Sequence, residues 1–292
     1  MTVIGLSLPY DYLCGSTATD SARLLSESFG PAAAALETFR QHGVRRIEIR
    51  HFPETVPADL IVRGCRVILR AGLEITLHPA TPSSPSSSRL SQPFPWIDAV
   101  LRLLAGRQKE LLLTLHGYLR AGGEEAQLSI KTQELFRSLA DLAEREQAPV
   151  RFALEMNREK GVTDPSNSYI STAGLCTRID RDGVGICWDW GHGFSNVLKG
   201  SMESDPPESF LERVIHTHIH GVGPSGRTHL PLTSGRLPTA RYAAALLGRG
   251  YRGTFCLELS PERFSSEEPV APAFMESIGL LNRTLSDLEN GD

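Results

Sequence analysis

The stretch GVGICWDWGHGFSNVLKGSMESDPPESFLERVIHTHIH, residues 183–220, begins with one short apolar run, GVGICWD (183–189), and ends with another, VIHTHIH (214–220). The same alternation of short apolar runs and longer amphipathic stretches recurs along the chain. It favours parallel strands joined by crossover helices over a sandwich or a helical bundle. Eight such runs suit closure into a barrel, and the other six are VIGLSL (3–8), RIEIR (46–50), LEITLH (73–78), ELLLTLH (110–116), VRFALE (150–155) and TFCLEL (254–259).

The stretches between the runs have a helical pattern. PAAAALETFRQ (31–41), AQLSIKTQELFRSLADLAERE (126–146) and PTARYAAALLGR (238–249) carry apolar residues at three-to-four spacing, as helices that cover a barrel do. The length of 292 residues is close to what an α/β barrel uses as one unit. The sequence therefore predicts a single (β/α)8 TIM barrel that spans residues 1–292.

One segment of low complexity, ATPSSPSSSRLSQPFP (80–95), follows the third run. Its serine and proline content predicts an irregular, mobile loop. Two interpretations remain open for this loop: a lid over the barrel mouth, or a plain surface excursion.

Composition narrows the class of protein. Hydrophobic residues make up 40% and charged residues 22% of the chain, which is the balance of a globular protein. The beginning of the sequence has no basic region leading into an apolar run, and no stretch is long and apolar enough to cross a bilayer, so we expect a cytoplasmic protein. A formal net charge of −4 argues against nucleic acid or a membrane as a partner. The five cysteines are widely spaced and odd in number, which predicts neither a disulfide framework nor a paired-cysteine zinc site.

Ionisable residues collect at the ends of the apolar runs. In chain order these are His78, His116, Glu155, Asp189 with His192 just beyond, His218 and Glu258. The strand ends of a parallel barrel meet at one mouth, where several carboxylates repel each other unless a cation neutralises them. Carboxylates combined with imidazoles suit zinc or manganese first, and cobalt or iron as well, while magnesium fits so many histidines less well.

Five motifs resemble the xylose isomerase-like barrels, a family that includes sugar and sugar-phosphate isomerases and epimerases together with endonuclease IV. They are ALEMN around Glu155, CWDWGH (187–192), HTHIHG (216–221), THLPLTSGRL (228–237) and LELSPE (257–262). The resemblance covers nearly the whole chain. It implies that Glu155, Asp189, His218 and Glu258 form the shared metal site, with His192 close by.

In the isomerase and epimerase branch, one metal binds the sugar oxygens and two glutamates move a proton at the carbon beside the carbonyl, through an enediolate. The resemblance implies that Glu155 and Glu258 are these acid/base groups. It further implies that His192 and Arg227 hold substrate oxygens. His216, His218 and His220 alternate along one strand face; His220 would then contact substrate or a ligand side chain at the strand end, while His216 would be packed deeper.

The endonuclease branch holds three metal ions and hydrolyses a phosphoester. The extra histidines of that branch are matched by His78, His116 and His229. Arg227 stands where that branch has an aspartate, so a third metal site should be weak, altered or absent. One to three ions therefore remain open. The isomerase is the preferred hypothesis and the hydrolase is the alternative, while a metal-free binding protein is disfavoured because every shared ligand is present.

A few further residues carry two interpretations each. Arg50 with His51, and Arg158 with Lys160, would either bind one phosphate or be solvated surface charges. Trp188 and Trp190 should face away from Asp189, and they would either pack the barrel, which is the preferred interpretation, or stack on substrate. The expected partner is a small sugar or sugar phosphate rather than DNA, and a homodimer is open because related barrels often pair through surface helices.

Overall fold

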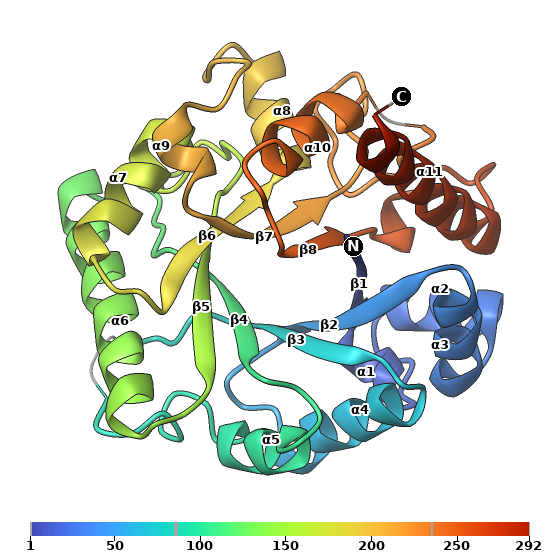
Figure 1. Cartoon of the computed structure of the whole chain (residues 1–292), viewed down its shortest axis with the longest axis horizontal. Helices are drawn as coiled ribbons and strands as arrows, with labels where there is room; N and C mark the ends of the chain where they lie inside the picture. Colours follow the sequence, from blue (N-terminus) through green and yellow to red (C-terminus); the bar gives the residue numbers. More distant parts are fainter. Residues whose placement is uncertain (1, 85–86, 235, 292) are drawn as a thin grey trace.

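The computed structural model describes residues 2–84, 87–234 and 236–291; for His51 it describes the backbone but not the side chain. Eight parallel strands form a closed barrel in chain order, and a ring of helices surrounds them (Figure 1). This confirms the predicted (β/α)8 barrel, and each predicted run overlaps one strand. The strands are β1 (Val3–Pro9), β2 (Val44–Phe52), β3 (Glu74–Pro79), β4 (Leu111–His116), β5 (Val150–Glu155), β6 (Val184–Asp189), β7 (Val214–Ile219) and β8 (Thr254–Leu257).

The helices follow the strands and pack on the outside of the barrel. All three helices predicted by apolar spacing form, as α3, α6 and α10. The full set in the described chain is α1 (Tyr10–Leu13), α2 (Asp20–Phe29), α3 (Ala32–Gln41), α4 (Ala58–Arg70), α5 (Ile97–Leu104), α6 (Glu125–Arg145), α7 (Tyr169–Ile179), α8 (Trp190–Leu198), α9 (Glu208–Leu211), α10 (Thr239–Leu247), the 3-10 turn η1 (Pro261–Arg263) and α11 (Val270–Asn290).

The parallel register aligns the residues that matter for the site. His116 on β4 pairs with Glu155 on β5, and Asp189 on β6 pairs with His218 on β7. Strand β8 ends at Leu257, but Glu258 continues the pairing through its backbone N–H, which donates to the carbonyl of Ile219 at 2.9 Å. The strand register therefore brings these side chains to one end of the barrel.

The aromatic residues beside Asp189 pack outward. Trp188 and Trp190 are fully buried, and both lie against the ring of Tyr242, with centroid distances of 4.7 Å and 5.7 Å. Both side chains therefore serve barrel packing, as the alternation along β6 predicts.

The serine- and proline-rich segment is irregular in its described residues, as predicted. Leu90 and Phe94 are nevertheless buried, and the backbone N–H of Leu90 donates to Glu146 Oε1 at 3.2 Å. Residues 85–86 lie outside the described part, so the mobility of the segment stays a prediction. Its beginning lies beside the barrel mouth, because Thr81 Oγ1 donates to the carbonyl of His116 at 2.9 Å.

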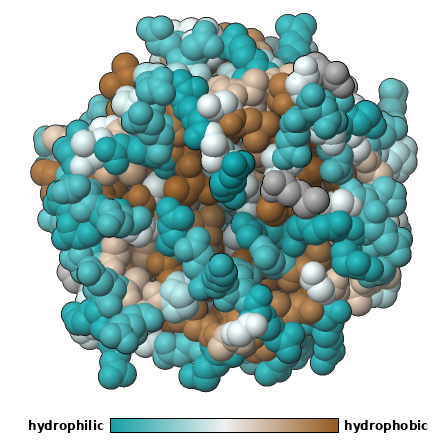
Figure 2. All heavy atoms as spheres, in the orientation of Figure 1, coloured by the Kyte–Doolittle hydropathy of each residue, from teal (hydrophilic) through white to brown (hydrophobic). Residues whose placement is uncertain are grey.

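The outer surface is mostly polar. Figure 2 shows hydrophilic side chains over most of the face in view, with apolar atoms mainly between and beneath them. Among the described residues, no helix is both long enough and apolar enough to span a bilayer.

Candidate metal centre

Four ligand-type side chains converge at the carboxyl ends of β5, β6, β7 and β8. One ligand atom from each of Glu155, Asp189, His218 and Glu258 lies within 4.8 Å of the others. All four side chains are buried. This is the end of the barrel at which (β/α)8 enzymes hold their active sites. The structure thus brings together the four residues that the resemblance implied.

The chain itself orients Asp189. This residue is the N-cap of α8, and its Oδ1 accepts the backbone N–H of His192 at 2.7 Å. The Nε2 atom of His220 lies 3.1 Å from the same oxygen. With Oδ1 held in this way, Oδ2 is buried and makes no hydrogen bond in the described chain. His220 thus contacts a ligand side chain, which was one of its two predicted roles.

His218 lies at the centre of the cluster. Its Nδ1 is 3.4 Å from both Glu155 Oε1 and Glu258 Oε2. Its Nε2 faces away from them, 2.9 Å from Glu48 Oε1. A carboxylate behind a metal-ligating histidine fixes the orientation of the ring and raises its basicity.

Glu48 was not among the predicted site residues. It is fully buried in the barrel interior, where it accepts a hydrogen bond from Ser7 Oγ at 2.8 Å and lies 3.1 Å from His216 Nε2. Burial by itself raises the pKa of Glu48, but His218 and His216 outweigh it and hold that pKa well below its usual value. The sequence did hold a signal for Glu48. The alternation in RIEIR puts Arg46, Glu48 and Arg50 on one face of a strand, so Glu48 could have been expected to face the barrel interior.

Arg50 lies on the same interior face of β2. The prediction of a solvated surface charge is wrong for it, because the side chain is 1% exposed and Nη1 lies 3.4 Å from Glu258 Oε1. Its Nη2 donates to the carbonyl of Leu259. Burial raises the pKa of Glu258, yet His218 and Arg50 together lower it below the usual value. Glu258 is therefore ionised at neutral pH. The side chain of His51, which was paired with Arg50 in the phosphate hypothesis, lies outside the described residues.

Glu155 lies between two groups of histidines. Its Oε2 is 3.0 Å from His78 Nε2 and 3.5 Å from His116 Nδ1, while its Oε1 faces His218 and His192. Although burial opposes it, the neighbouring histidines hold the pKa of Glu155 well below its usual value. The two oxygens of Glu155 therefore face two different groups of histidines.

A third group consists of imidazoles alone. One nitrogen from each of His192, His220 and His229 lies within 4.8 Å of the others. His229 has a left-handed backbone (φ 63°), and its N–H donates to His220 Nδ1 at 2.9 Å. Arg227, by contrast, is exposed and does not line the cavity that holds these residues.

The donor set fits a divalent cation. Several converging atoms are buried and make no hydrogen bond in the described chain: Glu155 Oε2, Asp189 Oδ2, His116 Nδ1, His192 Nδ1 and His218 Nδ1. These atoms lie at ion-pair distance from neighbouring site residues, as Asp189 Oδ2 does from His192 Nδ1 at 3.1 Å, and a divalent cation would give the converging atoms one shared partner. Burial lowers the pKa of His116 and lowers that of His192 to about 4, which keeps both rings neutral, the form that binds metal.

The cavity over the cluster is small, with a volume of about 190 Å³. Besides the cluster residues His78, His116, Glu155, His192, His229 and Glu258, its lining includes Arg158, Lys160, Thr228, Ser260, Glu262 and Arg263. Arg158 and Lys160 were predicted at this position from their place after β5. Arg263 was missed, although a basic residue directly after the eighth run was visible in LELSPERF.

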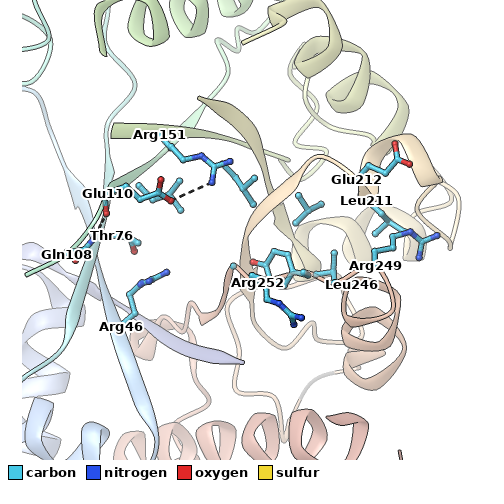
Figure 3. Close-up of a pocket in the computed structure, with 16 residues that line it drawn as sticks. Arg46, Thr76, Gln108, Glu110, Arg151, Leu211, Glu212, Leu246, Arg249 and Arg252 are labelled. Carbon is cyan, nitrogen blue, oxygen red and sulfur yellow. Dashed lines mark hydrogen bonds and ion pairs between the residues drawn. The ribbon is translucent and has the colours of Figure 1, made fainter. Parts of the chain in front are cut away.

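A larger hollow of about 540 Å³ lies at the opposite end of the barrel, around the amino ends of the strands (Figure 3). Arg46, Arg151, Arg249 and Arg252 line it together with apolar side chains. None of the converging ligand residues borders this hollow, and the amino-terminal end of such barrels is where residues serve stability. The smaller cavity is therefore the candidate site.

Comparison with known proteins identifies the family. Residues 36–283 match the family model described as xylose isomerase-like TIM barrel. The chain therefore belongs to the xylose isomerase-like TIM-barrel family. A curated relative, the uncharacterized protein MJ1188 of Methanocaldococcus jannaschii, is 37% identical over 75 residues, which is 24% of this chain and only 27% of the relative's length.

Solved structures share the fold at low sequence identity. D-psicose 3-epimerase from Clostridium cellulolyticum H10, solved with D-tagatose, aligns with a TM-score of 0.64 and 15% identity over 97% of this chain and 99% of that one. An L-ribulose 3-epimerase aligns with a TM-score of 0.61 and 17% identity, over 100% of this chain and 97% of that one. A xylose isomerase-like barrel from Mycobacterium smegmatis was solved in complex with magnesium. It aligns with a TM-score of 0.61 and 15% identity, over 98% of this chain and 97% of that one.

Proposed function

We propose that this protein is a divalent-metal-dependent isomerase or epimerase that acts on a sugar or a sugar phosphate. The observation that carries the proposal is the placement of two buried, ionised glutamates, Glu155 and Glu258, on either side of His218 in one small cavity. The sugar 3-epimerases among the structural neighbours support this class of reaction.

In this proposal Glu155, Asp189, His218 and Glu258 hold one divalent ion, zinc or manganese by the chemistry of the donors. When bound, such an ion polarises the substrate oxygens and so acidifies the neighbouring C–H group. The magnesium complex of one structural neighbour is consistent with a divalent ion in this fold.

The side chains perform the proton transfer. In an isomerase, one glutamate would remove the proton from the carbon beside the carbonyl and return it to the neighbouring carbon. In an epimerase, one glutamate would remove this proton and the other, protonated from solvent before the step, would donate a proton to the opposite face of the carbon. Arg50 keeps Glu258 ionised and fixes one of its oxygens, so that the other is directed toward His218.

Solvent exchange tests the class of reaction without knowledge of the substrate. Metal-loaded protein is incubated in D2O with a panel of ketoses and ketose phosphates, and proton NMR follows the hydrogen on the carbon beside the carbonyl. We expect deuterium to enter at this carbon in at least one compound. The absence of exchange across the panel, in folded and metal-loaded protein, would contradict the proposal.

Glu48 is a positioning residue in this proposal, and its replacement by glutamine (E48Q) has a defined expected result. The amide keeps the shape but removes the charge that holds the ring of His218, so metal affinity should fall by roughly 10- to 100-fold. Competition with a chromogenic chelator measures the dissociation constant. E74Q is the control, because Glu74 is an exposed glutamate at the far end of β3. An E48Q affinity within about twofold of the E74Q value would exclude the role.

A second candidate function, metal-dependent phosphoester hydrolysis, is favoured by one specific observation. His78 and His116 face the Glu155 oxygen that His218 does not use, and His192, His220 and His229 form a further group. These arrangements offer places for a second and a third ion. Multinuclear centres stabilise both the attacking and the leaving oxygens in such reactions.

The number of ions per chain separates the two functions. Protein purified without chelator should contain about one ion per chain if the isomerase proposal holds, and the double variant H78A/H116A should keep that ion, because neither histidine belongs to the four-residue group. The measurement is elemental analysis of both proteins. Two or three ions in the wild type, with a loss in the double variant, would favour the hydrolase.

A further inference from the structure

Two arginines from different parts of the chain share one wall of the site cavity. Arg158 follows β5 and Arg263 ends the 3-10 turn η1 after β8. Both line the cavity and both are partly buried, while Lys160 adds a third positive charge at the exposed rim. This wall lies in the same 190 Å³ space as Glu155 and Glu258.

Neither guanidinium is neutralised by a carboxylate. Among the described residues, Arg158 and Arg263 form no ion pair. Arg158 Nη1 donates only to neutral acceptors, the carbonyl of Gly226 at 3.3 Å and Thr228 Oγ1 at 3.4 Å, and its Nε is buried without a hydrogen bond. Glu262 precedes Arg263 in the sequence, but its carboxylate is exposed and accepts a hydrogen bond from Ser21 Oγ instead.

The arginines of the opposite hollow behave differently. Arg46 pairs with Glu74, Arg151 with Glu110 (Figure 3) and Arg249 with Glu208. The fourth arginine of this hollow, Arg252, is exposed and makes no ion pair among the described residues, so here only a solvated arginine lacks a carboxylate partner. The uncompensated pair is found where the ligand cavity is.

Holding the two cations together costs free energy in the free protein. Burial and the positive charge of Arg263 both lower the pKa of Arg158. Like charges at a partly buried position are tolerated when a bound anion neutralises them, and the guanidinium fork matches phosphate and carboxylate geometry. Among the described residues, no carboxylate of the candidate metal centre forms an ion pair with either guanidinium, although the charge of Asp189 offsets part of the lowering of the Arg158 pKa.

We infer that the substrate carries an ionised phosphate or carboxylate group and that Arg158 and Arg263 bind it, with Lys160 at the rim. This inference rests on the proposed function, since it places the reacting carbon at the metal centre and the anionic group on the arginine wall of the same cavity. The small cavity volume implies a short substrate, in which only a few atoms separate the two groups.

Binding of three matched probes tests the inference. Glycerol, glycerate and glycerol 3-phosphate differ mainly in the anionic group, and calorimetric titration of metal-loaded protein gives their dissociation constants. We expect at least one anionic probe to bind roughly 10-fold or more tightly than glycerol. Tighter binding of glycerate would identify the anionic group as a carboxylate, and tighter binding of glycerol 3-phosphate would identify it as a phosphate. Equal binding of all three would overturn the inference.

Variants separate the arginine wall from direct binding of the anion to the metal. The preference for the anionic probe should fall to about onefold to threefold in R158Q and in R263Q, and R158K should keep part of it. R252Q is the control, because Arg252 lies in the opposite hollow and makes no ion pair among the described residues. A preference that survives in both R158Q and R263Q would overturn the inference. Since the readout is binding, it is independent of the deuterium exchange that tests the proposed reaction.

Discussion

Glu258 replaced by glutamine (E258Q) is expected to lose catalytic turnover by about 10²- to 10⁴-fold while the barrel stays folded. The amide is nearly isosteric with the carboxylate, so the packing around Arg50 and His218 changes little. It cannot accept a proton, however, and it no longer neutralises Arg50, which lies 3.4 Å from Glu258 Oε1. The rate of deuterium exchange measures the loss, and circular dichroism checks the fold.

Two further observations make this result specific. Metal content must be measured beside the rate, because Glu258 also belongs to the ligand group and a lost ion would lower the rate for a different reason. E267Q is the matched control, because Glu267 is an exposed glutamate beyond the same strand and lies outside the site cavity. If metal-loaded E258Q kept more than a tenth of the wild-type rate, Glu258 would not be an acid/base group.

Asp189 replaced by alanine (D189A) is expected to abolish stabilisation by metal. In the wild type, an ion at 100 times its dissociation constant should stabilise the fold by about 2.7 kcal/mol, which raises the Tm by roughly 4–5 °C in a domain of this size. D189A loses a ligand and also the N-cap of α8, so it should unfold at a lower temperature and respond little to added metal. Thermal unfolding with metal and with chelator measures both effects.

S168A controls for the loss of a helix cap alone. Ser168 caps α7 by accepting the backbone N–H of Ser171, and it lies outside the ligand group. This variant should lose about 1 kcal/mol and still respond to metal as the wild type does. A wild-type Tm that chelator leaves unchanged would contradict the metal centre, and a full metal response in D189A would remove Asp189 from it.

Much of the candidate site was visible before the fold was known. His78, His116, Glu155, Asp189, His218 and Glu258 all stand at or beside strand ends, and parallel strands direct such residues to one mouth. Local sequence was sufficient here because strand ends can be read from short apolar runs. The prediction for Arg227 found no support in the geometry, because the loop after β7 turns this side chain outward and brings His229 inward through a left-handed backbone.

The interior of the barrel was less predictable. Glu48 and Arg50 stand in a strand whose apolar residues gave no indication of which face closes around the site. The Glu48 carboxylate was therefore missed, and Arg50 was left between two interpretations, a phosphate ligand or a solvated surface charge. Their partners, His218 and Glu258, are more than 150 residues away in sequence. Only closure of the sheet brings them within contact.

The sequence by itself determined the eight-stranded barrel and the set of candidate ligand residues, because periodic hydrophobicity decides which runs become strands and strand direction decides where their ends lie. Tertiary structure decided which atoms face one another: the Glu48 carboxylate behind His218, Arg50 against Glu258, and the unpaired Arg158 and Arg263 on one wall. The physical reason is that the two kinds of interaction act over different separations along the chain. Hydrophobic periodicity acts over a few neighbouring residues, whereas electrostatic partners are chosen across the barrel, where register and closure set every distance.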